Sequence, residues 1–254
     1  MKEKTYSALL GIAALGVGLT ASGFVYAGDL DKANDTGFQY GSQDDPYWFS
    51  VGGVVKLDET FFKGNNKDKG TQFRTGANLR DVGIDFEGGI GKDLTFTLGL
   101  SKDSDSKITI EDAYVTYKGF GENFDVSIGH VNPGFSIENT ASSKWTPLLE
   151  RSMASTALTP APGMGVSLNK WSDRYSINAA ITQPDHGKDK DTGKSDRWTA
   201  SARGTYALLH EGNRIFQVGV SGHYQDDNNK KITISAVPEA KARNTKAVVT
   251  TPID

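Results

Sequence analysis

Residues 48–62 alternate between apolar and polar side chains, so that one face of this segment is apolar and the other is largely polar. A period of two residues is the spacing of a β-strand, whose successive side chains point to opposite sides of a sheet. The segment is therefore predicted to be an amphipathic strand. One face carries Phe49, Val51, Gly53, Val55, Leu57, Glu59 and Phe61, and the other carries Trp48, Ser50, Gly52, Val54, Lys56, Asp58 and Thr60.

Segments of the same kind recur along the chain, and the connections between them sort by length. Connections after odd-numbered strands are long and hydrophilic, whereas those after even-numbered strands are short. A meander through a membrane places all short turns on one side and all long loops on the other. The pattern therefore predicts an all-β fold, a transmembrane antiparallel up-and-down β-barrel of about ten strands. The strands are expected at residues 48–62, 72–87, 94–100, 108–118, 124–130, 164–169, 174–182, 197–208 and 214–225, with a tenth beginning near Lys231.

Two of these segments change phase along their length. The apolar set of residues 72–87 shifts register between Leu79 and Val82, and that of residues 108–118 shifts between Ile110 and Ala113. Each shift requires one extra residue in the strand, so each predicts a β-bulge.

The first 27 residues have the layout of a secretion signal. Lys2 and Lys4 precede the apolar stretch Ser7–Leu19, and Val25–Ala27 supplies small residues before Gly28. This pattern predicts a cleaved signal peptide over residues 1–27. A membrane anchor is the alternative, but the glycines of the stretch and the cleavage site argue against it.

Residues 28–254 are expected to form one β-domain, since such domains often exceed 200 residues. The chain has no cysteine, so no disulfide holds this exported domain together. Its stability must come from an ordinary core or from a closed sheet in lipid.

The composition offers little for catalysis. The net charge of −3 argues against a nucleic-acid partner. The four histidines lie at strand ends or in loops without metal-ligand spacing, so no catalytic residue, metal or cofactor is predicted. The glycines of residues 88–93 lack the partners of a phosphate-binding loop and predict a hairpin turn. Residues 189–193 lack the closing acid of a calcium loop and predict a solvated loop.

From Ile108 onward, several short motifs together resemble the phosphate-selective porin O and P family of Gram-negative outer membranes. They are Glu111–Tyr117, Ile128–His130, Phe135–Glu138, Leu149–Ser152, Leu158–Pro160 and, more weakly, Arg203–Tyr206. The likeness spans residues 73–224. It implies an outer-membrane location, a sixteen-stranded trimeric barrel, an inward-folded loop that narrows the channel, and basic residues that draw anions through. The aperiodic residues 131–162 fall where general porins place such a constriction loop.

Two features depart from this family. The chain shows about ten predicted strands, and it ends in Thr251–Asp254 rather than on a strand with a terminal aromatic residue. We therefore expect either the front part of a longer porin or a shortened member. Open strand edges in hydrocarbon would cost several kcal/mol for each unpaired backbone group, so a truncated barrel is not expected to insert stably by itself.

Charges on the predicted inward face are the candidate pore-lining residues. Arginine suits phosphate or carboxylate guests, and rings of charge set ion preference. For Glu150 and Arg151, the favoured interpretation is that they pair with loop or wall charges and pin the loop. The resemblance implies a preference for anions or phosphate. Acids and bases roughly balance among the candidates, however, so we expect the ion preference to be weak. The candidates are Lys56, Asp58, Arg74, Arg80, Asp81, Asp85, Glu138, Lys144 and Arg151.

The leading hypothesis is an outer-membrane porin, embedded in lipid, for passive diffusion of small hydrophilic solutes or ions. The alternatives are a surface-exposed barrel acting as adhesin or structural anchor, a soluble periplasmic β-sandwich and, more remotely, a barrel-embedded hydrolase. The first strand discriminates among them. In a barrel, Lys56 and Asp58 point to the interior, while Val55 and Leu57 point to lipid.

Overall fold

The computed structural model describes residues 17–18, 38–41, 45–61, 76–102, 108–141, 151–184, 198–211, 214–226, 235–236 and 248–249. Strands dominate these residues, and the two helices are short. The strands are β1 (Val17–Gly18), β2 (Phe38–Tyr40), β3 (Tyr47–Thr60), β4 (Gly76–Ile90), β5 (Leu94–Lys102), β6 (Ile108–Tyr117), β7 (Phe124–Val131), β8 (Gly163–Trp171), β9 (Tyr175–Pro184), β10 (Trp198–Glu211), β11 (Arg214–Asp226), β12 (Ser235–Ala236) and β13 (Val248–Val249), and the helices are α1 (Ile137–Thr140) and α2 (Met153–Leu158).

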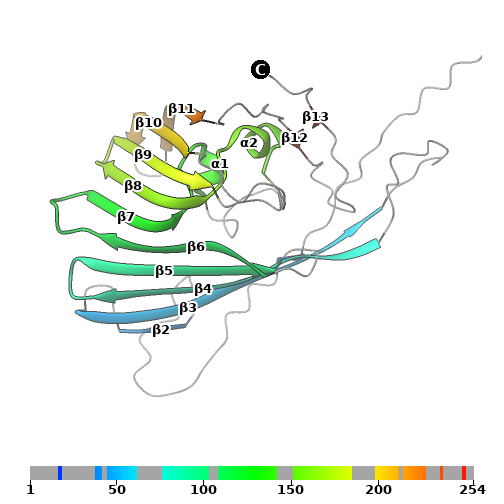
Figure 1. The fold of residues 1–254 in the computed structure, drawn as a ribbon, viewed down its shortest axis with the longest axis horizontal. Coiled ribbons are helices and arrows are strands. Elements are labelled where there is room, and N and C mark those ends of the chain that lie inside the picture. Colours follow the sequence, from blue (N-terminus) through cyan, green and yellow to red (C-terminus); the bar gives the residue numbers. More distant parts are fainter. Residues whose placement is uncertain are drawn as a thin grey trace, which may run out of the picture.

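The main sheet is an antiparallel meander from β3 to β11, in which strands that follow one another in sequence are neighbours in space. It curves strongly, with β3–β7 on one side, β8–β11 on the other, and α1 on the concave side (Figure 1). The predicted all-β antiparallel meander is confirmed. Within the described residues no ladder joins β11 to the strands at the opposite edge, so closure into a barrel stays a prediction.

The short strands at the ends of the chain were not predicted. β1 and β2 both pair with the outer edge of β3, and β1 lies inside residues 1–27, where the signal peptide stays a prediction. β12 pairs with β13 and not with the main sheet. The start of the tenth strand near Lys231 lies outside the described residues.

Both predicted bulges are confirmed. On β4, Lys56 pairs with Asp81 and Leu57 with Leu79, so Arg80 is the extra residue. On β6, Gly99 pairs with Asp112 and Leu100 with Ile110, which leaves residue 111 as the extra one. A third bulge, at residue 208 of β10, was not predicted from the sequence.

Aromatic rings cover the glycines next to the β4–β5 turn. A side chain at Gly89 would collide with the Trp48 indole, and one at Gly88 would collide with the Phe96 ring. Trp48 lies on the concave face and Phe96 on the convex face, because the cross-strand pairs put them on opposite sides of the sheet. The glycines therefore let two large rings lie flat on the sheet close to its turn.

Burial in the sheet is the reverse of burial in a soluble protein. On β3, Val55 and Leu57 are 46% and 52% exposed, whereas Asp58 is 5% exposed. Soluble cores bury aliphatic side chains and leave charges outside, but here most buried side chains are polar. The buried hydrophobic side chains of the described residues are Trp48, Val131, Ala180 and Ala207; the buried polar ones are Gln39, Ser50, Asp58, Arg80, Ser101, Thr116, Ser127, His130, Asn139, Ser167, Thr182, Thr199, Ser201 and Thr205.

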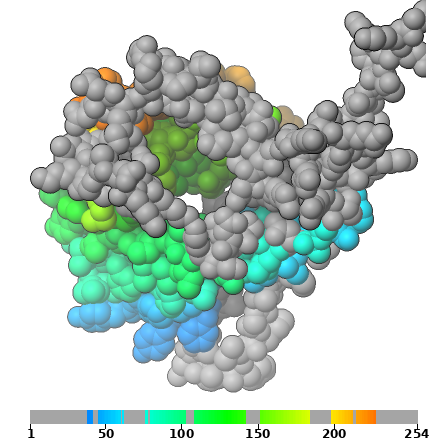
Figure 2. All heavy atoms as spheres, turned by 45° about the vertical axis from the view of Figure 1, so that its right-hand side comes forward, coloured from blue at the N-terminus to red at the C-terminus, as the bar shows by residue number. Residues whose placement is uncertain are grey.

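The sheet thus presents its apolar face outward and its polar face to a hollow, which the described strands border in Figure 2. The concave face of β3–β11 is called the inner wall below. Among the described residues, no helix combines the length and the apolar character needed to cross a membrane.

Candidate functional site

Two ion pairs join β3 to β4 on the inner wall. Both the Nε and the Nη2 of Arg80 donate to Oδ2 of Asp58, with an Nε to Oδ2 distance of 2.9 Å. The side chains of this pair are only 3% and 1% exposed. The Lys56 Nζ lies 3.8 Å from Oδ2 of Asp81, in a pair that is more open to solvent. Two predicted pore-lining bases therefore each lie beside a carboxylate.

Further carboxylates form a row across the strands of the inner wall, from β4 to β6. Asp85 pairs across the sheet with Gly99, and Gly99 pairs with Asp112. An ideal Cβ on Gly99 would lie 3.5 Å from Oδ1 of Asp85 and 3.7 Å from Cβ of Asp112. The two acids therefore flank a position without a side chain, and Glu87 lies two residues from Asp85 on the same face. Asp85, Glu87 and Asp112 are called the acidic wall.

Hydroxyl and amide groups make up much of the inner wall from β6 to β10. The hydroxyls of Thr116 and Ser127 lie 2.8 Å apart, and the amide of Asn178 donates to Ser167 and to Asn169. The hydroxyls of Thr182, Thr199 and Ser201 are buried and have no hydrogen-bond partner among the described residues. Uncharged polar side chains thus line this part of the inner wall.

The segment between β7 and β8 folds into two serine-capped turns of helix. Ser136 caps α1 by accepting from the backbone N of Asn139, and Ser152 caps α2 by accepting from the backbone N of Ser155. The cap of α1 is joined to α2 itself, because Oγ of Ser136 lies 2.8 Å from Oγ of Ser155. Residues 132–141 and 151–162 are called the inner loop.

Charged groups hold the inner loop together. Oε2 of Glu138 accepts from the hydroxyl and from the backbone N of Ser152, each at 2.8 Å, and these bonds hold the pKa of the Glu138 carboxyl below its ordinary value. Nε of Arg151 donates to the backbone O of Glu138 at 2.7 Å. Arg151 therefore joins the two described parts of the inner loop; that it pairs with a loop or wall charge stays a prediction, and Glu150 lies outside the described residues.

The inner loop also contacts the inner wall. Nη1 of Arg203 on β10 donates to the Thr140 hydroxyl at 3.1 Å. The ring of Phe135 meets the ring of His223 on β11 edge to face, with centroids 5.1 Å apart. The contacts place α1 against the β9–β11 side of the wall, where Figure 1 shows it.

The structure brings most predicted pore-lining residues into two groups. Lys56, Asp58, Arg80 and Asp81 form the paired cluster on β3 and β4, with Asp85 farther along β4; Glu138 and Arg151 meet in the inner loop. Arg74 and Lys144 lie outside the described residues. That these residues line a pore stays a prediction.

The sequence-based selection missed Asp112, Arg203, Asn178 and His223. Asp112 and Arg203 share the inner wall with the predicted residues, and their alternation with outward apolar neighbours was the signal that could have found them. The contacts of His223 and Asn178 with the loop depend on the curvature of the sheet, which leaves no local signal.

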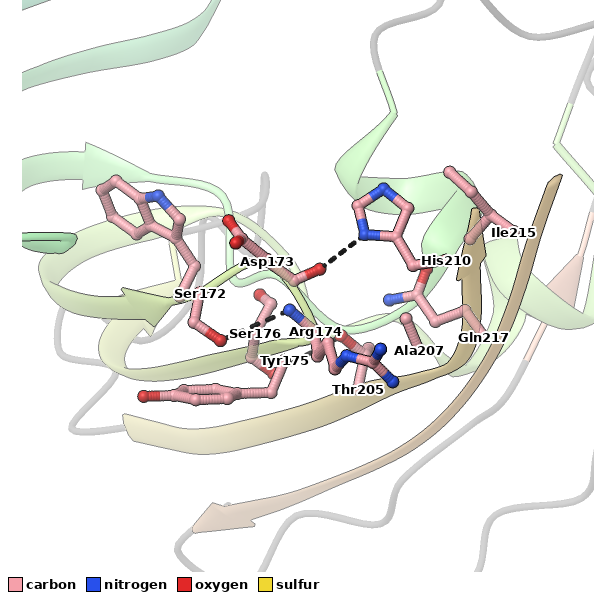
Figure 3. Close-up of a pocket in the computed structure, with 11 residues that line it drawn as sticks. Ser172, Asp173, Arg174, Tyr175, Ser176, Thr205, Ala207, His210, Ile215 and Gln217 are labelled. Atoms are coloured by element: carbon pink, nitrogen blue, oxygen red, sulfur yellow. Dashed lines mark hydrogen bonds between the residues drawn. The ribbon is translucent and has the colours of Figure 1, made fainter. Parts of the chain in front are cut away.

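A shallow hollow lies where the β8–β9 and β10–β11 turns come together (Figure 3). Nδ1 of His210 donates to the backbone O of Asp173 at 2.9 Å, and the backbone N of Arg174 donates to Oγ of Ser172 at 3.3 Å. These bonds close the turn rather than assemble a reactive group. No cluster of three potential metal ligands occurs among the residues that the structure describes.

Comparison with known proteins gives two matches. A family model described as "Phosphate-selective porin O and P" matches residues 49–253. Porin O of Pseudomonas aeruginosa is 27% identical to the chain over 234 residues, which are 85% of this chain and 52% of that protein. The chain therefore spans about half the length of this relative. The family match confirms the resemblance that the short motifs indicated.

Proposed function

Because the chain belongs to the phosphate-selective porin O and P family, we propose that it is an outer-membrane porin. It allows passive diffusion of small hydrophilic solutes or ions through a water-filled β-barrel. The observation that carries the proposal is the reversed burial, with Val55 and Leu57 exposed on the convex face and Asp58 and Arg80 buried on the concave one. Hydrocarbon outside and water inside make this arrangement favourable.

No covalent chemistry is part of this function. Porins are not enzymes, so membership of the family confirms the prediction that the chain is not an enzyme. The protein's contribution is physical: the wall excludes lipid, and polar side chains line the passage for hydrated solutes.

The inner loop is proposed to narrow the passage. It lies on the concave side of the sheet, and its two helices are fastened to each other through Ser136, Ser155, Glu138 and Ser152. A loop that is cross-linked in this way can hold a fixed aperture, because its turns cannot move independently.

Two ion preferences compete. The family description names phosphate, and the bases predicted to attract anions include Arg74 and Lys144. On the described wall, however, Lys56 and Arg80 lie beside carboxylates, and the acidic wall adds negative charge on β4 and β6. We propose a general diffusion pore with a weak preference, in which the acidic wall offsets anion attraction.

The lipid and subunit contacts are proposals as well. The exposed apolar side chains of the convex face, such as Ile84, Ile128 and Val220, suit outer-membrane hydrocarbon. A homotrimer is proposed from the family resemblance, and its test is the mass of the detergent-solubilised complex.

Planar-bilayer recording of the purified protein tests the porin proposal. Discrete, ohmic conductance steps are expected, and the reversal potential in a salt gradient measures the ion preference. Bilayers that remain sealed despite demonstrated insertion would reject it and favour the adhesin or anchor alternative. That alternative depends on the loop at residues 183–196, most of which lies outside the described residues.

A further inference from the structure

The inner loop is attached to the wall at one contiguous patch. Asn178 and Arg203 are directly paired across β9 and β10, and His223 of β11 pairs with Ser201, two residues along β10. These side chains therefore lie next to one another on the inner wall. Arg203 contacts the loop, His223 contacts it as well, and the loop backbone lies close to Asn178. The attachment therefore involves three neighbouring strands.

The close approach of the loop to this patch is visible at Gly134. An ideal Cβ on Gly134 would lie 3.0 Å from Cγ and from Oδ1 of Asn178. That spacing is tighter than ordinary contact, so the backbone of the loop rests almost directly on the Asn178 side chain. Asn178 is itself held by its bonds to Ser167 and Asn169, which makes it a firm support.

Arg203 provides the polar part of the attachment. Its Nη1 donates to the Thr140 hydroxyl, which in turn lies within hydrogen-bonding distance of the backbone O of Ser136 and of Ile137. The hydroxyl thus links a wall arginine to the backbone carbonyls at the start of α1. Because the α1 cap Ser136 is bonded to Ser155 of α2, a bond at Thr140 restrains both helices.

On these contacts, we propose that Arg203 is a positioning residue that latches the inner loop to the wall, rather than a group that primarily attracts the solute. The inference rests on the proposed porin function for its consequence, since the latch would set the aperture. The docking itself does not depend on conduction and is measured separately below.

The test uses variants of the whole chain that break the bond from either end. Arg203→Met removes the donor and the charge, Thr140→Val removes the acceptor with the charge intact, and Arg203→Lys retains one charged donor. Thr156→Val is the matched control. Its hydroxyl also bonds to the carbonyl four residues back, but it has no bond to the wall among the described residues.

The first measurement is hydrogen exchange at the backbone amides of Thr140 and Ala141, which donate to the backbone O of Ser136 and of Ile137. Arg203→Met and Thr140→Val should each speed exchange about tenfold, the effect of losing one hydrogen bond to a charged group. The double variant should be no faster than either single one, and Arg203→Lys should recover part of the protection. Thr156→Val should match the wild type.

The second measurement is open-channel noise and reversal potential in planar bilayers. If Arg203 is a latch, Thr140→Val and Arg203→Met should both raise the open-channel noise. Thr140→Val should leave the reversal potential at the wild-type value. If Thr140→Val leaves both exchange and noise unchanged while Arg203→Met shifts the reversal potential, the latch is overturned and Arg203 acts on the solute. If the wild type does not conduct, the porin proposal fails, and the exchange measurement still decides the latch by itself.

Discussion

The buried pair of Asp58 and Arg80 allows a quantitative test of how this wall is held together. At 2.9 Å and an effective dielectric constant of about 20, the attraction between two unit charges is about 6 kcal/mol. Removing both ions from water costs several kcal/mol for each, so the attraction and the desolvation penalty nearly cancel. The pair should therefore contribute little net stability when intact.

Removal of one partner should be much more costly. In the described structure Oδ2 of Asp58 accepts both of its bonds from Arg80, and Oδ1 has no partner. Arg80→Met leaves a carboxylate that is nearly inaccessible to solvent, and the expected loss is about 3–5 kcal/mol in the free energy of unfolding. The double variant Arg80→Met/Asp58→Leu should lie within about 1–2 kcal/mol of the wild type, because no buried charge remains.

Urea unfolding of the protein in detergent micelles, followed by tryptophan fluorescence and far-ultraviolet circular dichroism, measures these differences. Lys56→Met is the control, since its pair with Asp81 is longer and 19–27% exposed and should be worth less than about 1 kcal/mol. A loss below 1 kcal/mol for Arg80→Met, or a double variant as unstable as the single one, would refute the reasoning.

Three further predictions concern the loop and the wall. The pKa of Glu138 is depressed in the folded loop, so its bonds to Ser152 stabilise the loop fully above the ordinary pKa of 4.5. This stabilisation is lost as the pH falls through the lower folded-state pKa. Hydrogen exchange at the Ser152 amide should accelerate in that pH range, and Glu138→Gln should abolish the pH dependence. Gly134→Val should push the loop off Asn178 and raise open-channel noise, whereas Gly222→Val on β11, where an added Cβ meets nothing within 4 Å, should not change the noise. Asp85→Asn/Asp112→Asn should shift the reversal potential toward anions, and an unchanged value would remove the acidic wall from the account of selectivity.

Alternation alone predicted the order and the direction of the main strands, because every second side chain of a meander shares one environment. It failed where a strand is too short to show a period. β2 is three residues long and pairs with the edge of β3, so only the neighbouring strand defines it. The ends of strands such as β4, which runs to Ile90, depend on cross-strand bonding rather than on composition.

The inner loop shows a different limit. The serines that cap α1 and α2 are local features, but the bond from Arg203 to Thr140 joins residues 63 apart. Such a contact forms because the curved sheet carries β10 back over the segment that follows β7. Neither the residue types nor their spacing contain that curvature, so the sequence indicated an aperiodic segment without indicating its attachment.

The bulge on β4 explains how two consecutive charged residues can share the inner wall. Strict alternation would place Arg80 and Asp81 on opposite faces, and an arginine on the lipid face near the membrane midplane costs about 2–4 kcal/mol. The extra residue resets the register between Lys56 and Leu57, so that Arg80 reaches Asp58 while Asp81 reaches Lys56. Deleting one residue at this bulge would force one charge outward or shift Ala77 and Leu79 to the polar side. The phase change in the sequence therefore places both charges on the inner wall.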